Sequence, residues 1–192
     1  MISHRPRVVA EVNTNAIIHN YRQIRNFVPK YTQIMSIVKA DGYGHGAVEV
    51  AQILQKEGVD YFAVAIASEG GELRQTGIQT PILVLGYTPA ADIPILIEND
   101  LTQTVFSYEM AKYISYEASK LGKRIKVHIK VDTGMGRIGF LSHPASIQEI
   151  IDINQLPNIE IEGIFTHFST ADETDGNYTK QQSSIFYGFL KE

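Results

Sequence analysis

Residues 34–46, Ile-Met-Ser-Ile-Val-Lys-Ala-Asp-Gly-Tyr-Gly-His-Gly, join an apolar run to a glycine-rich turn through one lysine, Lys39. The run at 34–38 is typical of a short buried strand, so Lys39 falls at its carboxyl end, where parallel sheets and barrels place their chemistry. The three glycines permit tight turns and close approach of the backbone to a ligand, and Tyr43 adds a hydroxyl among them. The next helix is expected to begin near Ala47.

Strand-length apolar runs alternate with amphipathic helical patterns along the rest of the chain. The expected strands cover residues 8–12, 34–38, 61–65, 82–85, 103–106, 125–131 and 159–165. The expected helices cover residues 15–28, 47–56, 68–76, 90–99, 107–121, 143–154 and 179–191, with Gly77 and Gly122 as helix terminators. This alternation predicts an α/β protein with a parallel sheet.

Six βα-type strands remain when the N-terminal strand is set aside. A closed (β/α)8 barrel of the TIM type has eight strands and typically about 250 residues, so a barrel begun here is expected to be incomplete. A doubly wound open sheet would suit six strands, but the GxGxxG fingerprint expected after its first strand is absent. No linker or short repeat divides the chain, and residues 1–192 are interpreted as one domain.

The composition is that of a globular protein and argues against several function classes. Hydrophobic residues make up 44% and charged residues 20%, and the formal net charge of −4 argues against a nucleic-acid surface. No apolar run approaches the roughly 18 residues of a membrane-spanning helix, and the N-terminus lacks the apolar region of a signal peptide, so we expect a cytoplasmic protein. The absence of cysteine removes disulfides, thiolate zinc sites and cysteine nucleophiles.

A second stretch alternates strictly between apolar and polar residues. Val127, Ile129 and Val131 fall on one face, and the other face carries Lys126, His128, Lys130 and Asp132. In a helix-wrapped barrel the apolar face would meet the helices and the polar face the lumen and its mouth, which suggests a site. An edge strand with one solvated face is the alternative.

Three segments resemble the alanine racemase family, and they occur in the family's order. They read VKADGYGHG at 38–46, VDTGMGRIGF at 131–140 and THFSTAD at 166–172. The resemblance covers essentially the whole chain and implies that residues 1–192 are the N-terminal part of a barrel that binds pyridoxal 5′-phosphate. On this resemblance, we expect the C-terminal β domain of the family to lie outside these residues.

The resemblance implies a role for each matched residue. Lys39 would form a covalent Schiff base with the cofactor and act as a catalytic base on one face of the substrate. Arg137 would bond the phenolic oxygen of the cofactor and lie near the substrate carboxylate, and Lys130, often carbamylated in the family, would orient it. His167 would buttress a cofactor-binding arginine that lies beyond residue 192. The residues expected to contact the cofactor are Lys39, Tyr43, Leu85, Arg137 and His167.

The implied activity is the racemisation of L- and D-alanine, an isomerase reaction that supplies D-alanine for cell-wall peptidoglycan. The second catalytic base of the family is a tyrosine from the C-terminal domain of the other subunit. We therefore expect the complete enzyme to be a homodimer that acts on a small amino acid, with no nucleic-acid partner and no membrane segment, and these residues to be inactive alone.

Three alternatives share part of this pattern. A serine racemase built on the same scaffold would carry every motif seen here. A non-catalytic barrel that binds pyridoxal phosphate would also have a strand-end lysine, but it would need no Arg137 loop. Relatives that decarboxylate amino acids are disfavoured by the sequences around Lys39 and Arg137. A C-terminal sequence with or without the catalytic tyrosine would discriminate among them.

Other polar residues suggest no further chemistry. The histidines at 4, 19, 45, 128 and 143 show no HExxH or similar spacing, and no metal is assigned. Glu160 and Glu162 alternate on one strand, and we interpret them as a solvated or helix-contacting face rather than a carboxylate pair. Ser169 and Ser183 lie in no GxSxG motif.

Overall fold

A parallel sheet forms the centre of the computed structural model, which describes residues 8–192. Its strands are β1 (Met35–Ile37), β2 (Tyr61–Val64), β3 (Ile82–Val84), β4 (Thr102–Val105), β5 (Ile125–Asp132), the short β6 (Phe140–Leu141) and β7 (Ile159–Phe165). Each strand pairs in parallel with its predecessor, except that β7 pairs with β5. A doubly wound sheet would reverse its strand order midway, whereas this order follows the chain. The predicted parallel barrel, present in part, is confirmed.

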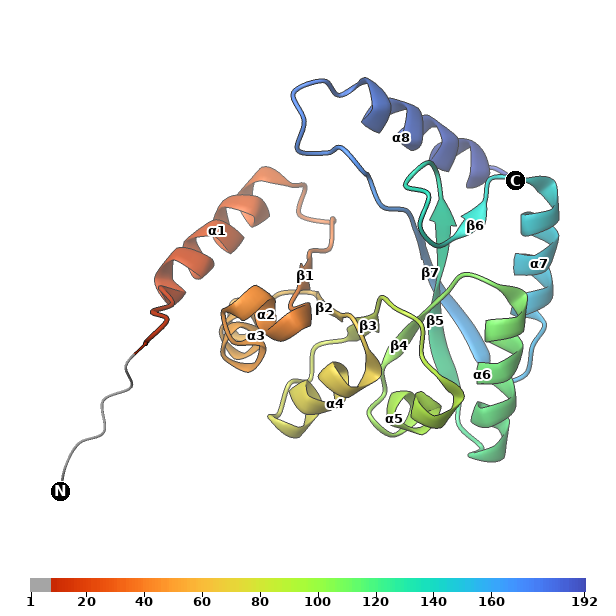
Figure 1. The fold of residues 1–192 in the computed structure, drawn as a ribbon, viewed down its shortest axis with the longest axis horizontal. Helices are drawn as coiled ribbons and strands as arrows, with labels where there is room; N and C mark the ends of the chain where they lie inside the picture. Colours follow the sequence, from red (N-terminus) through yellow and green to blue (C-terminus); the bar gives the residue numbers. More distant parts are fainter. Residues whose placement is uncertain (1–7) are drawn as a thin grey trace.

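The helices lie outside the strands in an arc, which Figure 1 shows for α3 to α7. They are α1 (Thr14–Phe27), α2 (Lys39–Gly44), α3 (Ala47–Lys56), α4 (Ala67–Gln75), α5 (Ile93–Glu98), α6 (Tyr108–Lys120), α7 (Pro144–Asn154) and α8 (Asn177–Phe189), with a 3-10 turn η1 (Ala90–Asp92) before α5. Polar side chains cap several of them: Asn13 accepts from the Ala16 N–H of α1 at 3.2 Å, and Ser107 accepts from the Met110 N–H of α6 at 3.3 Å.

The two faces of the strands contribute to two apolar clusters. Residues such as Phe62, Val127 and Ile129 point toward the helices and are fully buried in the larger cluster. The alternate positions form a smaller cluster, made of Tyr61, Ala63 and Leu83 with Met35, Leu85 and Phe165 packed against it. The period-two alternation of the strands therefore separates a helix-facing layer from the lumen of the barrel.

Several local features differ from the predictions, among them the short strand β6, which was not expected. The strand expected at 8–12 is wrong: these residues form no helix or strand, and Val8 is 88% exposed, because an apolar run without a neighbouring strand gains no ladder of hydrogen bonds. The helix expected at 90–99 is split after η1, since Pro94 fits only the first turn of α5. The helical turn α2 was not expected.

Glycines end helices where the sequence predicts. Gly77 and Gly122 follow α4 and α6 with φ of 89° and 61°, the left-handed conformation that a residue without a side chain adopts most readily. None of the described helices is long and apolar enough to cross a membrane.

Candidate active site

The predicted site residues line one cavity of about 310 Å³ at the carboxyl ends of the strands. Lys39 follows β1, Lys130 lies in β5 and Arg137 lies between β5 and β6. The complete lining is Ile37, Lys39, Tyr43, Ala65, Leu85, Gly86, Lys130, Arg137, Ile138 and His167. The structure thus brings together all six residues that the sequence nominates, from five separate segments of the chain.

The cavity is basic. Its lining includes two lysines, an arginine and a histidine but no carboxylate. Lys130 is only 5% exposed, and burial lowers its pKa, as do Arg137 and Lys39, while Asp132 acts in the opposite direction. No ion pair among residues 8–192 includes Lys130. Because buried cations without a partner are costly, this arrangement favours the binding of an anionic group.

Residues 40–43, which follow Lys39 directly, form a left-handed turn. All four have φ between 51° and 60° and ψ between 34° and 53°. This conformation costs about 1–2 kcal/mol for each residue other than glycine, so only Gly42 adopts it freely. Asp41 helps to hold the turn, because its Oδ1 accepts a hydrogen bond from the Ala47 N–H at 2.9 Å and so joins the turn to the start of α3.

Asp132 fixes the loop that carries Arg137. Its Oδ1 accepts hydrogen bonds from the N–H groups of Gly134 and Gly136 at 2.9 and 3.1 Å, and its Oδ2 accepts from the Arg137 N–H at 3.1 Å. Burial acts to raise the pKa of Asp132, but these backbone donors together lower it. The carboxylate therefore stays ionised and holds the backbone on both sides of Met135.

Gln182 on α8 joins the Arg137 loop to the segment that carries His167. Its side chain is fully buried. The Oε1 atom accepts from the N–H and the hydroxyl of Ser169 at 3.0 and 3.2 Å, and the Nε2 atom donates to the carbonyl of His167 at 3.1 Å and to Oγ1 of Thr133 at 3.4 Å. This residue could not be predicted from the sequence, because a single glutamine in an amphipathic helix has no local signature.

Gln182→Leu is expected to lower the free energy of unfolding by about 2 kcal/mol or more. The substitution leaves the Ser169 N–H and the His167 carbonyl without their partner at a partly buried place, where each unpaired group costs about 1 kcal/mol, the low end of the range for buried groups. Urea denaturation measures the change. Gln181→Leu is the matched control, since Gln181 is exposed on the same helix and should change stability by less than about 0.5 kcal/mol. Equal losses in the two variants would contradict this role.

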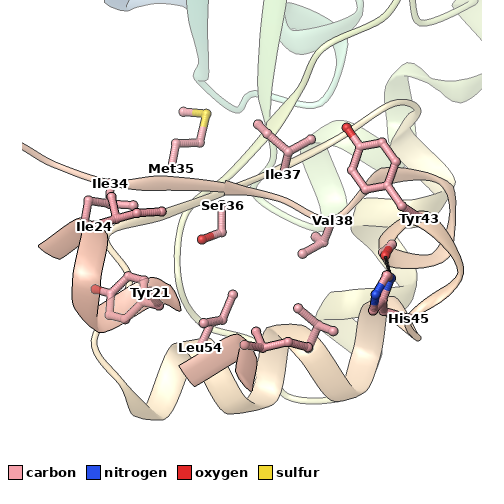
Figure 2. Close-up of a pocket in the computed structure, with 13 residues that line it drawn as sticks. Tyr21, Ile24, Ile34, Met35, Ser36, Ile37, Val38, Tyr43, His45 and Leu54 are labelled. Atoms are coloured by element: carbon pink, nitrogen blue, oxygen red, sulfur yellow. Dashed lines mark hydrogen bonds between the residues drawn. The ribbon is translucent and has the colours of Figure 1, made fainter. Parts of the chain in front are cut away.

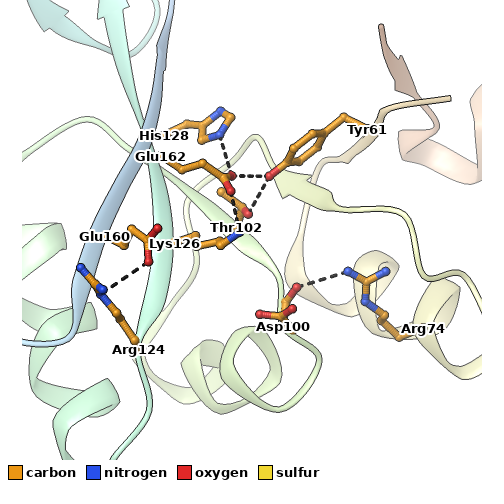
Figure 3. Close-up of polar contacts among 9 residues, drawn as sticks. All are labelled: Tyr61, Arg74, Asp100, Thr102, Arg124, Lys126, His128, Glu160 and Glu162. Atoms are coloured by element: carbon orange, nitrogen blue, oxygen red, sulfur yellow. Dashed lines mark hydrogen bonds and ion pairs between the residues drawn. The ribbon is translucent and has the colours of Figure 1, made fainter. Parts of the chain in front are cut away.

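A polar cluster occupies the opposite end of the lumen (Figure 3). Glu162 accepts hydrogen bonds from the hydroxyl of Tyr61, from Nζ of Lys126 at 2.7 Å and from the ring of His128 at 3.1 Å. Since β5 pairs with both β4 and β7, the edge-strand interpretation of β5 is wrong and its polar face points into the barrel. Glu162 is exposed, as the interpretation of a solvated face predicts, but it belongs to the lumen side of the sheet and is not packed on a helix. Glu160 pairs separately with Arg124 and is no catalytic partner to it.

Stability should depend on pH through His128. Burial lowers its pKa, although Glu162 acts in the opposite direction. The unfolded chain takes up a proton near pH 6.5 and the folded protein only at lower pH, so the free energy of unfolding falls as the pH drops below about 6.5. His128→Gln is expected to weaken this dependence by up to about 1.4 kcal/mol per pH unit. Urea denaturation from pH 7.5 to 5 tests it, with exposed His19→Gln as control; an unchanged slope for His128→Gln would contradict it.

A second cavity, of about 420 Å³, lies between α1, β1 and α3 (Figure 2). Its lining is mainly apolar and includes Tyr21, Ile24, Ile34 and Leu54, and it shares Ile37 and Tyr43 with the basic cavity. Apart from His45 no titratable nitrogen lines this cavity, so it contains no lysine or arginine that could bind an anionic group. Over residues 8–192 no group of three or more histidine, aspartate or glutamate side chains is arranged to hold a metal ion; His4 lies outside the described residues.

Comparison with known proteins gives one consistent result. A family model described as "Alanine racemase, N-terminal domain" matches residues 12–192. The alanine racemase of Methanococcus maripaludis is 48% identical over 192 residues, which are 100% of this chain and 51% of that protein.

Solved structures agree with the sequence matches. An alanine racemase from Clostridium difficile 630 is 47% identical with a TM-score of 0.90, and the match covers 92% of this chain and 46% of that one. A histidine racemase from Leuconostoc mesenteroides is 31% identical with a TM-score of 0.81, over 90% of this chain and 46% of the other. The chain spans about half the length of the curated relatives it matches.

Proposed function

Because this chain belongs to the alanine racemase family, we propose that it forms the pyridoxal-phosphate-binding barrel of an enzyme that interconverts L- and D-alanine. The observation that carries the proposal is the basic cavity, in which Lys39, Lys130 and Arg137 converge at the carboxyl ends of the strands. Active sites of such barrels lie at this end. Since the relatives are about twice as long, the activity is that of the protein to which this barrel contributes.

The cavity lining suits pyridoxal 5′-phosphate. The phosphate and the phenolic oxygen of the cofactor are anionic, and they match a set of cations without a carboxylate, of which Lys130 is buried and Lys39 half-buried. The side chains of Leu85 and Tyr43 would flank the ring. Arg137 would bond the phenolic oxygen with its planar guanidinium, and His167, whose pKa is lowered by burial and then by Arg137, Lys130 and Lys39, would contact the cofactor as a neutral ring.

Lys39 would hold the cofactor covalently through its primary amine. Bound pyridoxal phosphate withdraws electrons and so acidifies the α-proton of an amino acid. When the substrate displaces it, Lys39 would remove or return that proton on one face of the substrate, while Arg137 would bind the substrate carboxylate. Racemisation needs a second base on the other face, and we assign it to a tyrosine of a partner subunit in a homodimer, outside residues 1–192.

Lys130 would become carbamylated. A neutral amine is the form that adds carbon dioxide, and the lowered pKa of Lys130 favours that form. The modification would replace a buried cation by an anion beside Arg137, which supports the geometry proposed for that guanidinium. In the cell we propose that the enzyme acts in the cytoplasm and supplies D-alanine for peptidoglycan.

Racemisation by the natural protein that carries these residues tests the proposal. With pyridoxal phosphate present, L-alanine should be converted to an equal mixture of both enantiomers, faster than L-serine or L-histidine, as chiral chromatography would show. Serine turning over faster than alanine would favour the serine racemase alternative. A folded protein that binds the cofactor and racemises none of the three would contradict the proposed activity.

A further inference from the structure

One carboxylate links the turn after Lys39 to the end of the neighbouring strand. Oε1 of Glu69 accepts a hydrogen bond from the Ala40 N–H at 2.8 Å. Oε2 accepts from the N–H groups of Ala65 at 2.6 Å and Ile66 at 3.3 Å. Ala40 follows Lys39 directly, and Ala65 lines the same cavity as Lys39. The side chain therefore joins the ends of β1 and β2 beside the basic cavity.

Only the bond to Ile66 is an ordinary feature of a helix start. Glu69 is the third residue of α4, and a glutamate there commonly bonds the N–H of the residue that precedes the helix. The bonds to Ala40 and Ala65 lie outside that pattern. The first of them spans 29 positions of the sequence, which makes it a tertiary contact.

The segment that receives this bond is unfavourable on its own. Residues 40–43 are left-handed, and such a conformation persists only where the surroundings determine it. Within residues 38–47, the Gly42 N–H bonds the Val38 carbonyl, and Asp41 bonds the Ala47 N–H. Among the described residues, Glu69 is the one side chain from outside that segment that bonds its backbone. The Val38 N–H before Lys39 bonds the Ala63 carbonyl of β2, and Glu69 is the external contact on the other side of Lys39, where the chain enters the left-handed turn.

We infer that Glu69 is a positioning residue, which directs the Lys39 side chain into the basic cavity by holding the Ala40 N–H in the left-handed turn; the functional part of this inference rests on the proposed cofactor attachment at Lys39. The chemistry requires a carboxylate. Both of its oxygens only accept hydrogen bonds, whereas an amide of the same shape would turn an NH2 group toward at least one of the backbone N–H groups.

Glu69→Gln tests the inference in the natural protein, with Glu72→Gln as the matched control, because Glu72 is exposed on the same helix. Amide hydrogen exchange without cofactor is followed by mass spectrometry on peptides that cover residues 38–46. Glu69→Gln should exchange there about tenfold faster or more than wild type, and Glu72→Gln at the wild-type rate. After incubation with pyridoxal phosphate and borohydride reduction, label on Lys39 should fall by a similar factor in Glu69→Gln alone.

If residues 38–46 of Glu69→Gln exchange at the wild-type rate and only the start of α4 exchanges faster, Glu69 acts only as a helix cap. That result would overturn the inference. If Glu69→Gln does not fold, Glu69→Asp replaces it, because the shorter carboxylate can still cap α4 but cannot reach both loops. Faster exchange confined to residues 38–46 is then expected. Unchanged exchange of these residues in Glu69→Asp overturns the inference. Absence of label on Lys39 in wild type would refute the proposed cofactor attachment instead, while the exchange data would still decide the role of Glu69.

Discussion

Lys39→Ala is expected to abolish covalent cofactor attachment and to lower racemisation by at least about 10³-fold, because the substitution removes both the amine that binds the cofactor and a base. The expectation follows from the place of Lys39 at the end of β1 and at the edge of a cavity with two other cations, the buried Lys130 and the exposed Arg137. The two measurements are the amount of cofactor attached to the protein after borohydride reduction and the rate of alanine racemisation.

The matched control is Lys123→Ala. Lys123 is exposed in the turn between α6 and β5, outside the cavity, so its loss should leave both label and rate unchanged. Racemisation that survives in Lys39→Ala, or equal label in Lys39→Ala and wild type, would show that the cofactor attaches elsewhere and that the basic cavity is not the site of reaction.

Gly139→Ala is expected to destabilise the protein by about 3 kcal/mol or more, since backbone strain and overpacking each cost roughly 1–3 kcal/mol. Gly139 has φ of 141°, a conformation that residues with a side chain avoid. An added Cβ would lie 2.5 Å from the N atom of Asp132 and 2.8 Å from the carbonyl carbon of Val131. Both are backbone atoms at the end of β5, so no flexible side chain can move to relieve the clash.

The control Gly136→Ala, in the same loop, distinguishes the cost of backbone strain from the cost of the steric clash of an added Cβ. Gly136 has φ of 70°, and an added Cβ would meet no atom within 4 Å. The control should therefore cost only about 1 kcal/mol. Urea denaturation compares the two variants, and similar losses of stability would show that the contact between Gly139 and the end of β5 does not constrain the Arg137 loop.

The periodic elements of the fold could be predicted from the sequence. The helix Ala47–Lys56 and the strand Ile159–Phe165 agree with their predicted bounds, because a strong apolar pattern meets clear turn residues at the ends. The left-handed turn at 40–43 could not be predicted in the same way. Ala40 and Tyr43 favour right-handed or extended backbone, and contacts from outside the segment impose the left-handed conformation.

Some residues of the candidate site could likewise be predicted from the sequence, and others could not. Lys39 and Arg137 could be nominated because each lies in a long, specific motif at the end of a strand. Glu69 and Gln182 carry no such signal, since each is a single polar residue in a helix whose partners lie far away in the sequence. The contact between Glu69 and Ala40 spans 29 positions, and that between Gln182 and Thr133 spans 49. Such supporting residues can be identified only from the three-dimensional structure, in which the strands and their loops lie side by side.

The attachment of pyridoxal phosphate tests the central claim most directly. The chain is incubated with the cofactor and reduced with borohydride, and the modified peptide is mapped by mass spectrometry beside a circular-dichroism melt. The account predicts a cooperative melt and label concentrated on Lys39. A cooperative melt with label absent, or spread over the surface lysines, would contradict it, because a correctly folded barrel would then lack the cofactor site that the basic cavity is proposed to be.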